Sequence, residues 1–423
     1  MDKVLLFTDC YIYGGSERLA VYILGNEQVN KAFEMVFSYR KFELYEGPLN
    51  YDLNRYHIRA TRHPLTLLAN DTRFYNLDRG GNPAWVNKVI KLPFTIFQKS
   101  GLYFLYNFIT FLALLRKVRP DILHINNGGY PGSLRCNHLL MAARCCGIKS
   151  IVYQVNNIAS KGKSIFSRYQ NAYVDRNVQF FVTASLRAKE ALVKERGFSP
   201  SKMVTIPNSI MDEGVSLGRE ALLKKWDLPE NAFLLVQVAF LTGRKGQIHL
   251  LKAVLAIKNM RIPGLSDRIK VMLVGDGEDE KGLRSYISEN GLTGTAILTG
   301  YQDNPADFVS AADVFLLPSI ANEDMPLAML TAMSIGKPII ASRFAGIAEA
   351  IREEYEEGIL LEVDPSTMSD QICRAVLRLY ENPGVGDRLA GNARKRYLDE
   401  YSQEAYGKRF RELYQKVMAS TKP

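Results

Sequence analysis

A basic pair between two glycines follows an apolar run in the second half of the chain. Arg244 and Lys245 lie in segment 242–246, directly after the strand-like run 233–238 and before a helix-like stretch over 249–257. A helix start and cationic side chains both attract anions, so this turn is a candidate phosphate clamp. Because Lys and Arg in loops are usually only solvated, the turn alone is a weak indication.

Later strand-like runs also end in residues suited to ligand contact. Gly275 and Gly277 form a tight turn in which the missing Cβ atoms permit close backbone approach. Tyr301 follows the next run, and its ring either lies against a nucleobase or caps the core. Glu349 closes a small-residue turn further along the chain.

A carboxylate precedes a helix that we predict over Leu327–Ile335. Glu323 can accept backbone N–H groups or sugar hydroxyls, and Pro326 suits the first turn of that helix. The amides of Met325 and Leu327 are then available to an anion. In open parallel sheets, ligands bind beyond the carboxyl ends of the strands, which is where all of these residues fall.

Two successive series of strands and helices must position these residues. We predict strands over 4–7, 35–38, 122–125, 150–155 and 180–183, and then over 233–238, 270–274, 296–299, 314–317, 338–341 and 359–361. Helix-like stretches separate many of them, which favours a doubly wound parallel α/β class with two domains. We interpret residues 42–91 as long loops with short elements, and 386–420 as one or two charged helices.

The chain resembles the group 1 glycosyl transferases of glycosyltransferase family 4. The pieces that carry the resemblance occur in order over nearly the whole chain: Gly14-Gly15-Ser16-Glu17, Arg119-Pro120-Asp121-Ile122-Leu123-His124, Ser185, Ile206-Pro207-Asn208, Lys245-Gly246, Leu273-Val274-Gly275-Asp276-Gly277, Gly300, Ala312-Asp313-Val314, Pro318-Ser319, Glu323 with Met325-Pro326-Leu327, Ala332-Met333, Gly336-Lys337-Pro338, and Gly346 with Glu349.

That resemblance implies a GT-B fold, two Rossmann-like lobes facing a cleft. It implies an acceptor-side lobe over 1–205, a nucleotide-sugar donor lobe over 206–400, and a final helix over 401–423 that returns to the first lobe. It also implies retaining transfer from a nucleotide-diphosphate sugar, with neither a metal nor a cofactor. Lys245 then contacts the diphosphate, Gly14 and Gly15 face it, and Glu323 holds the donor sugar.

Three positions depart from the family pattern. Thr331 stands where a second glutamate usually bonds the ribose, and Phe240 stands where an arginine usually precedes the lysine, a charge that Arg244 is a candidate to replace. Asn156 stands where many members have a histidine near the donor sugar; an amide orients hydroxyls but takes up no proton near neutral pH. His124 does not replace that histidine, because we interpret it as a buried structural residue.

We therefore expect a catalytic set of Glu323, Lys245 and Asn156. The expected donor-binding set is Gly14, Gly15, Arg244, Gly275, Gly277, Tyr301, Met325, Leu327, Thr331 and Glu349. Asn126 and Tyr130, from the turn over 126–132 that follows a strand, are the acceptor-side candidates.

Composition restricts the partners. The net charge of +10 and pI of about 9.2 fit nucleic acid, an anionic membrane surface or phosphorylated small molecules, and no nucleic-acid-binding signature occurs at the expected spacing. The five cysteines show no metal-site spacing and indicate reduced thiols. The start of the sequence reads as a strand rather than a signal peptide, so we expect a cytoplasmic protein.

The apolar run 101–115 is too short to span a bilayer as a helix. It is either a core helix or a basic-flanked surface that docks peripherally on the inner face of a membrane.

The three departures from the family pattern leave two functions open. The first is an active hexosyltransferase-like enzyme that builds polysaccharide or another glycoconjugate on a saccharide or lipid-linked saccharide acceptor. The second is a weak or inactive nucleotide-sugar-binding scaffold of a polysaccharide assembly complex.

Overall fold

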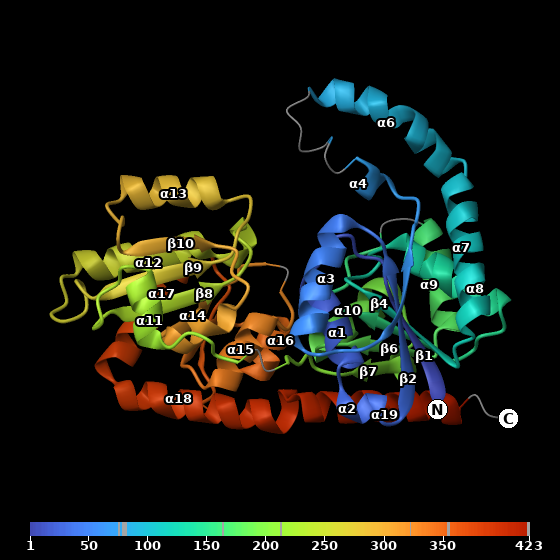
Figure 1. Ribbon diagram of the computed structural model, residues 1–423. Helices are drawn as coiled ribbons and strands as arrows, with labels where there is room; N and C mark the ends of the chain where they lie inside the picture. Colours follow the sequence, from blue (N-terminus) through green and yellow to red (C-terminus); the bar gives the residue numbers. More distant parts are fainter. Residues whose placement is uncertain are drawn as a thin grey trace. The chain divides into compact units, whose positions relative to one another are not determined.

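The chain folds into two compact α/β units. The computed structural model describes residues 1–74, 77, 83–162, 165–211, 214–321, 323–352 and 356–420. The first unit comprises Met1–Ala184, Ala188–Ile206 and the chain from Gly407 onward, and the second comprises Ser185–Arg187 and Pro207–Tyr406. Each unit is a parallel sheet covered by helices on its two faces (Figure 1).

The first unit is built on a seven-stranded sheet in which every strand pair is parallel. Its strands are β1 (Asp2–Thr8), β2 (Phe33–Arg40), β3 (Thr61–Leu65), β4 (Ile122–Asn127), β5 (Ile151–Val155), β6 (Phe180–Thr183) and β7 (Met203–Thr205). Their spatial order is β3-β2-β1-β4-β5-β6-β7. The strand order therefore reverses between β1 and β4, where Thr8 pairs with Asn126.

The second unit is built on a six-stranded sheet whose strand pairs are also parallel. Its strands are β8 (Phe233–Val238), β9 (Ile269–Val274), β10 (Ala296–Gly300), β11 (Val314–Leu317), β12 (Ile339–Ser342) and β13 (Ile359–Leu361). The order β10-β9-β8-β11-β12-β13 reverses between β8 and β11. All eleven predicted strands are present, whereas β3 and β7, two edge strands, were not predicted.

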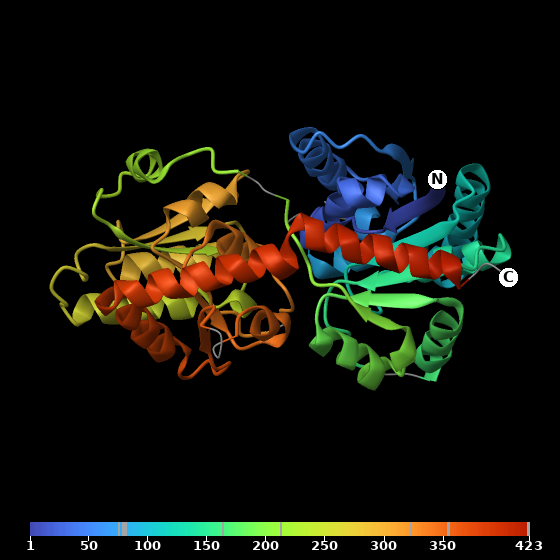
Figure 2. The same cartoon turned by 90° about the horizontal axis from the view of Figure 1, so that it is seen from below.

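The helices of the first unit cover its sheet and end in a long C-terminal helix (Figures 1 and 2). They are α1 (Gly15–Leu24), α2 (Glu27–Asn30), α3 (Glu43–Arg55), α4 (Asn70–Arg73), α6 (Ala84–Lys99), α7 (Leu102–Val118), α8 (Leu134–Cys145), α9 (Ile165–Asn177) and most of α10 (Leu186–Arg196) and α19 (Gln403–Ala419). His124 of β4 is fully buried, and its Nδ1 lies 2.7 Å from the hydroxyl of Tyr414 in α19. The interpretation of His124 as a buried structural residue is confirmed.

The prediction of long loops over 42–91 was wrong. This segment contains α3, a helix of 13 residues, and α6, a helix of 16 residues that continues to Lys99. Both helices carry a proline inside, Pro48 and Pro93, and α3 also contains Gly47. These residues are helix breakers by sequence rules, so they concealed two helices that tertiary packing stabilises.

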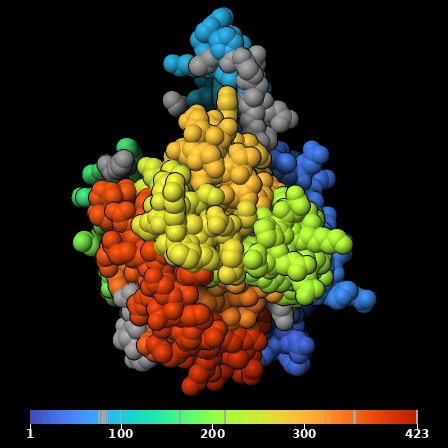
Figure 3. Space-filling view, turned by 90° about the vertical axis from the view of Figure 1, so that its left-hand side faces the viewer, coloured from blue at the N-terminus to red at the C-terminus, as the bar shows by residue number. Residues whose placement is uncertain are grey.

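The helices of the second unit are α11 (Arg219–Lys225), α12 (Gln247–Asn259), α13 (Glu280–Glu289), α14 (Pro305–Ala311), α15 (Leu327–Ile335), α16 (Ala345–Ala350), α17 (Met368–Glu381) and α18 (Pro383–Arg396). Figure 3 looks onto this unit, with α18 in red and α11 in yellow-green at its surface. A 3-10 turn over Gly243–Lys245 precedes α12, and a π-helical turn over Tyr397–Tyr401 follows α18. The predicted helix over Leu327–Ile335 has these same bounds.

Each unit has its own apolar core. In the first, Leu123, Ile125 and Phe111 belong to a cluster that joins the sheet to α7 and α8. In the second, Leu235 and Val271 belong to a cluster that joins the sheet to α12 and α17. Central strands buried on both faces read as nearly continuous apolar runs, which is why their positions could be predicted.

No single helix among the described residues is long and apolar enough to cross a membrane. Helices α6 and α7 together meet that length and composition, but the pair bends by 57° at the break between them. The apolar run 101–115 lies in helix α7, apart from its first residue, Gly101. Gly101 precedes the helix and has a left-handed backbone conformation.

Candidate functional site

A buried ion pair occupies the point of the second sheet where the strand order reverses. Lys245 lies in the turn after β8, and Glu323 lies in the loop after β11. Their side chains, 9% and 10% exposed, form an ion pair between Lys245 Nζ and Glu323 Oε2. Because ligands of doubly wound sheets bind outside the strand ends at this reversal, the pair lies where a ligand is expected.

The surroundings fix the pair in place. Ser319 Oγ donates to Glu323 Oε2 at 3.1 Å, and Arg244 Nη1 lies 3.8 Å from the same oxygen. Gln237 of β8 donates to the carbonyl of Lys245 at 2.8 Å. Burial lowers the pKa of Lys245, and the opposing charge of Glu323 counteracts that effect. The site therefore gathers two cations around one carboxylate.

Gly246 allows the β8 turn to approach the β11 loop. Its φ is 72°, and a Cβ at this position would overlap the carbonyl oxygen of Pro318. The loops are also joined by the amide of Ile320, which donates to the carbonyl of Arg244 at 2.8 Å. A residue larger than glycine would push the two loops apart, and with them the ion pair.

Gly275 and Gly277 allow a similarly close approach at the neighbouring strand, β9. A Cβ on Gly275, whose φ is 137°, would overlap the carbonyl of Ala239, and one on Gly277 would overlap the backbone of Leu241. Both glycines therefore pack the turn after β9 against the turn after β8. Tyr301, which follows β10, has a ring that is 58% exposed.

The remaining predicted donor residues of this unit are held by the protein itself. Thr331 is buried in α15, where its hydroxyl donates to the carbonyl of Leu327 at 3.2 Å. Asn208 Nδ2 donates to the carbonyl of Met325 at 2.7 Å. Glu349 accepts two backbone N–H groups, from Leu186 at 2.9 Å and Arg187 at 3.0 Å. Phe240, where the family pattern has arginine, is exposed in the turn after β8.

Asp324, beside Glu323, is a buried carboxylate that was not predicted. Its Oδ1 accepts the amide of Gly346 at 3.2 Å. Burial raises its pKa to about 6, the Ser185 and Gly346 hydrogen bonds oppose that rise, and the charges of Glu349 and Glu323 add to it. Asp324 links the β11 loop to the start of α16. At a pH close to its pKa, its carboxyl group is only partly ionised.

In the first unit, hydrogen bonds join the glycine turn to two asparagines at the strand ends. Asn126 Nδ2 donates to the carbonyl of Ser16 at 2.9 Å, and Asn156 Nδ2 donates to Asn126 Oδ1 at 2.7 Å. Gln154 donates to Asn156 Oδ1 at 2.8 Å, so both ends of the Asn156 amide have protein partners. Asn156 therefore orients Asn126 against the turn at Gly14 and Gly15.

The glycine turn itself is closed by a buried carboxylate. Glu17 accepts the amide of Gly14 at 3.2 Å and the hydroxyl of Ser16 at 2.7 Å. Burial raises the pKa of Glu17, although these hydrogen bonds oppose the rise. Glu17 thus fixes the start of α1.

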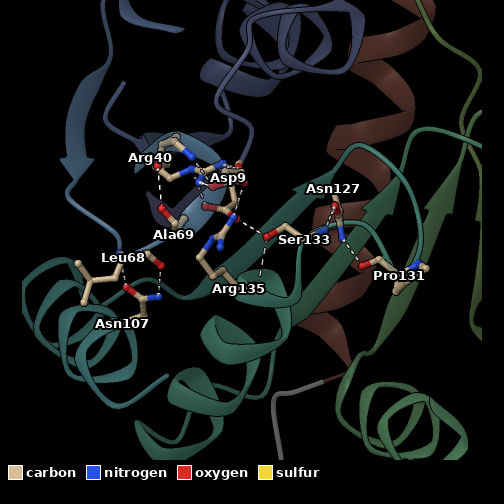
Figure 4. Close-up of polar contacts among 11 residues, drawn as sticks. Asp9, Arg40, Leu68, Ala69, Asn107, Asn127, Pro131, Ser133 and Arg135 are labelled. Atoms are coloured by element: carbon tan, nitrogen blue, oxygen red, sulfur yellow. Dashed lines mark hydrogen bonds and ion pairs between the residues drawn. The ribbon is translucent and has the colours of Figure 1, made fainter. Parts of the chain in front are cut away.

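A cavity of about 590 Å³ opens beside this network, also at the reversal of strand order. Asp9, directly after β1, and Arg40, at the end of β2, meet Arg135 of α8 in its wall (Figure 4). Asp71 of α4 also lines the cavity. Arg135 Nε donates to Asp9 Oδ2 at 2.6 Å, and Arg40 Nη1 donates to Asp71 Oδ1 at 2.8 Å. Further bonds join Arg40 to the carbonyl of Asp9 and Arg135 to Asp71.

Among the residues that the structure describes, the charges of the cavity wall balance. Two arginines and two aspartates line it, and burial lowers the pKa of His138 to about 4, so this ring is neutral at pH 7. Burial alone would raise the pKa of Asp71, but hydrogen bonding and charge from Arg40 outweigh it and the pKa is lowered. Rings of Tyr11, Tyr103 and Phe104 complete the wall.

Of the two residues predicted on the acceptor side, Asn126 lines this cavity and Tyr130 does not. The Tyr130 ring is 2% exposed and packs in the core, 4.9 Å from the ring of Phe198. Asp9, Arg40, Asp71 and Arg135 were not predicted. Asp9 and Arg40 lie two positions beyond the ends of the strands predicted over 4–7 and 35–38, so the strand-end rule applied to the second half would have found them.

The sequence matches two family models. One, described as glycosyl transferases group 1, covers residues 218–396, and the other, described as glycosyltransferase family 4, covers residues 51–213. The matches together reach into both units, and the chain belongs to the group 1 glycosyl transferases of family 4. Its two Rossmann-like sheets are those of the GT-B fold.

Known proteins agree with this assignment. The chain is 28% identical to the Escherichia coli UDP-Gal:alpha-D-GlcNAc-diphosphoundecaprenol alpha-1,3-galactosyltransferase, over 72% of this chain and 78% of that protein. It is 26% identical to the lipopolysaccharide core biosynthesis glycosyltransferase LpsE of Rhizobium meliloti, over 43% of this chain and 49% of that protein. The match therefore spans only about half the length of LpsE.

A solved structure has the same fold. HepE of Anabaena in complex with UDP superposes with a TM-score of 0.73 at 16% identity, covering 98% of this chain and 100% of that one.

Proposed function

We propose that the chain is a retaining hexosyltransferase that moves a sugar from a nucleotide-diphosphate donor to a saccharide or lipid-linked saccharide. The proposal rests on the buried contact between Lys245 and Glu323 at the strand reversal of the second sheet. A diphosphate needs cations, and a sugar needs hydrogen-bond acceptors for its hydroxyls. This pair supplies one of each within a single contact.

On binding, the donor would replace the contact between Lys245 and Glu323 with its own contacts to each side chain. Lys245 and Arg244 turn to the diphosphate oxygens, which releases the Glu323 carboxylate to accept sugar hydroxyls. The bond from the anomeric carbon to the phosphate oxygen then breaks with the electron pair leaving on the diphosphate. The acceptor oxygen bonds to the same face of that carbon, and its proton passes to the departing phosphate oxygen.

We propose that no metal or other cofactor takes part, because Lys245 and Arg244 can neutralise the charge of the diphosphate. A leaving diphosphate is stabilised when fixed positive charges lie where its charge develops. Two cationic side chains beside the N-terminal end of α12 meet that need.

We propose that the acceptor binds in the cavity of the first unit. A neutral wall of paired arginines and aspartates with aromatic rings suits an uncharged sugar better than a phosphate, which would have to displace the aspartates. UDP-sugars and lipid-diphosphate-linked saccharides are the first substrates to test, because the Escherichia coli relative is described as acting on that combination. On the same ground we propose that the protein works at the cytoplasmic face of a membrane, in polysaccharide or glycoconjugate assembly.

A nucleotide-sugar-binding scaffold is the second candidate. It is favoured by Thr331 and Asn156, two of the departures from the family pattern, because the polar groups of both side chains are engaged by the protein. An arrangement that binds a donor without promoting transfer would tolerate such losses.

One experiment separates the two candidates. A thermal-shift screen of nucleotides and sugar nucleotides identifies the donor, since a ligand that binds only the native state raises the Tm. The best donor is then incubated with a lipid-linked saccharide, and nucleoside diphosphate release is measured. Release together with a glycosylated product supports the enzyme. Donor binding without release over the full panel of acceptors supports the scaffold.

A further inference from the structure

Helix α6 carries an apolar stripe on its exposed side. Trp85, Val89, Leu92 and Ile96 follow one another at helical spacing, so they share one face, and each is between 57% and 70% exposed. Ile90 and Phe97 widen this stripe. Large side chains scattered singly on a surface need no explanation, but a continuous row of them marks an interaction surface.

Helix α7 continues the stripe after the bend. Leu102, Leu105, Tyr106 and Ile109 are each between 43% and 56% exposed on its outer side. The opposite side of α7 packs into the core of the first unit through residues such as Phe111, Leu114 and Leu115. A helix that already buries one apolar face has no need of a second one for folding.

The charge of the two helices is of one sign. The sequence from Ala84 to Val118 contains no aspartate or glutamate. Lys88 is exposed beside the α6 stripe, and Arg116 and Lys117 are exposed at the end of the α7 stripe. Basic groups bordering an apolar face are complementary to anionic lipid headgroups above an acyl layer.

We propose that the outer faces of α6 and α7 bind an anionic phospholipid bilayer, with the apolar stripes at the acyl boundary and the basic residues at the headgroups. Figure 1 shows α6 extending beyond the sheet of the first unit, where a flat partner can reach it. The stripes run along the exposed sides of two helices that meet at a bend of 57°.

The same helices bound the cavity of the first unit. Gln98 of α6 and Tyr103, Phe104 and Asn107 of α7 line it, so a bilayer on their outer side lies next to its wall. Resting on the function proposed above, this arrangement supplies the acceptor from the membrane: the lipid stays in the bilayer while its saccharide enters the cavity.

Vesicle binding by the full-length protein tests the proposal without any substrate. We expect the protein to sediment with vesicles made of equal parts phosphatidylglycerol and phosphatidylcholine, less with phosphatidylcholine alone, and less at high salt. The double variant Ile96→Asn with Ile109→Asn should weaken the partition into anionic vesicles by about tenfold or more. Both side chains are exposed, so the variant should keep the Tm of the parent.

A matched variant controls for loss of any exposed apolar side chains. Met260→Asn with Leu398→Asn removes two side chains of similar exposure from the second unit and should leave vesicle binding unchanged. Equal binding by the parent and the Ile96/Ile109 variant overturns the proposal. So does a parent that ignores vesicles and forms a dimer that the same variant dissociates, because a second copy then covers the stripes.

The result is separable from the proposed function. If the parent protein binds vesicles but transfers no sugar, the proposed bilayer-binding surface is supported and the proposed transferase activity is refuted. A parent that transfers sugar to soluble acceptors and ignores vesicles refutes the bilayer surface alone.

Discussion

Lys245 and Glu323 are 78 positions apart in the sequence and in direct contact in the fold. Each follows a different strand, and those strands, β8 and β11, are neighbours at the point where the order of the second sheet reverses. Removing Glu323 leaves Lys245 as a buried charge without this counter-ion, and removing Lys245 leaves Glu323 with the more distant cation of Arg244, at 3.8 Å. The pair is therefore both a structural constraint and the centre of the proposed donor site.

Glu323→Ala should raise the KM for the donor and lower kcat together. The variant removes the acceptor of the sugar hydroxyls and leaves Lys245 without its carboxylate, and we expect kcat/KM to fall by roughly 10²–10³-fold. Steady-state kinetics over donor concentration measures this. Glu289→Gln, at an exposed position of α13, is the matched control. A change confined to the KM of the acceptor would contradict the donor assignment.

Thr331→Glu should destabilise the protein rather than restore a ribose contact. Thr331 is buried in α15 and bonded to Leu327, so a carboxylate there loses its hydration. We expect a loss of about 3 kcal/mol, which lowers the Tm by roughly 6–12 °C. Thr331→Val, which keeps the shape, should stay within a few degrees of the parent. A soluble Thr331→Glu variant with unchanged Tm and a lower donor KM would show that the side chain reaches the ribose.

Asp324 makes the second unit less stable as pH rises from about 4 to about 6. Its folded pKa of about 6 lies above the ordinary value of 3.8, so the folded state holds a proton that the unfolded state has lost. The free energy of unfolding therefore falls by up to about 3 kcal/mol as the pH rises from about 4 to about 6. Asp324→Asn should remove this fall in denaturant unfolding at pH 4, 5, 6 and 7. Parallel curves for parent and variant would show that the carboxyl titrates normally.

Arg135→Gln should weaken acceptor binding and leave the donor reaction unchanged. Arg135 lines the cavity of the first unit and holds Asp9 and Asp71, so its loss leaves both carboxylates to share Arg40 and adds one net negative charge to the wall that faces the acceptor. We expect a rise of about tenfold in the acceptor KM, with donor binding in the thermal-shift assay unaltered. Arg144→Gln, on the exposed side of the same helix, is the control. Equal kinetics for the two variants would place the acceptor elsewhere.

The sheets could be predicted because central parallel strands are continuous apolar runs, as in β1 and β11. Helices α3 and α6 were not predicted, because Pro48 and Pro93 lie inside them and only tertiary packing reveals that the helix continues. The resemblance to family 4 identified Lys245 and Glu323 as site residues. That the two side chains contact each other could be seen only in the folded structure. The cavity of Asp9, Arg40, Asp71 and Arg135 depends on four separate segments, and no spacing in the sequence brings these together.

Turnover by a Lys245→Ala variant tests the central claim most directly. Release of nucleoside diphosphate from the donor found in the thermal-shift screen should fall at least about 10³-fold, because the leaving group loses its buried cation. The circular dichroism spectrum and the acceptor binding of the variant should match those of the parent. Release at the parental rate by a folded Lys245→Ala variant would contradict the account, because the diphosphate would then leave without the Lys245–Glu323 site.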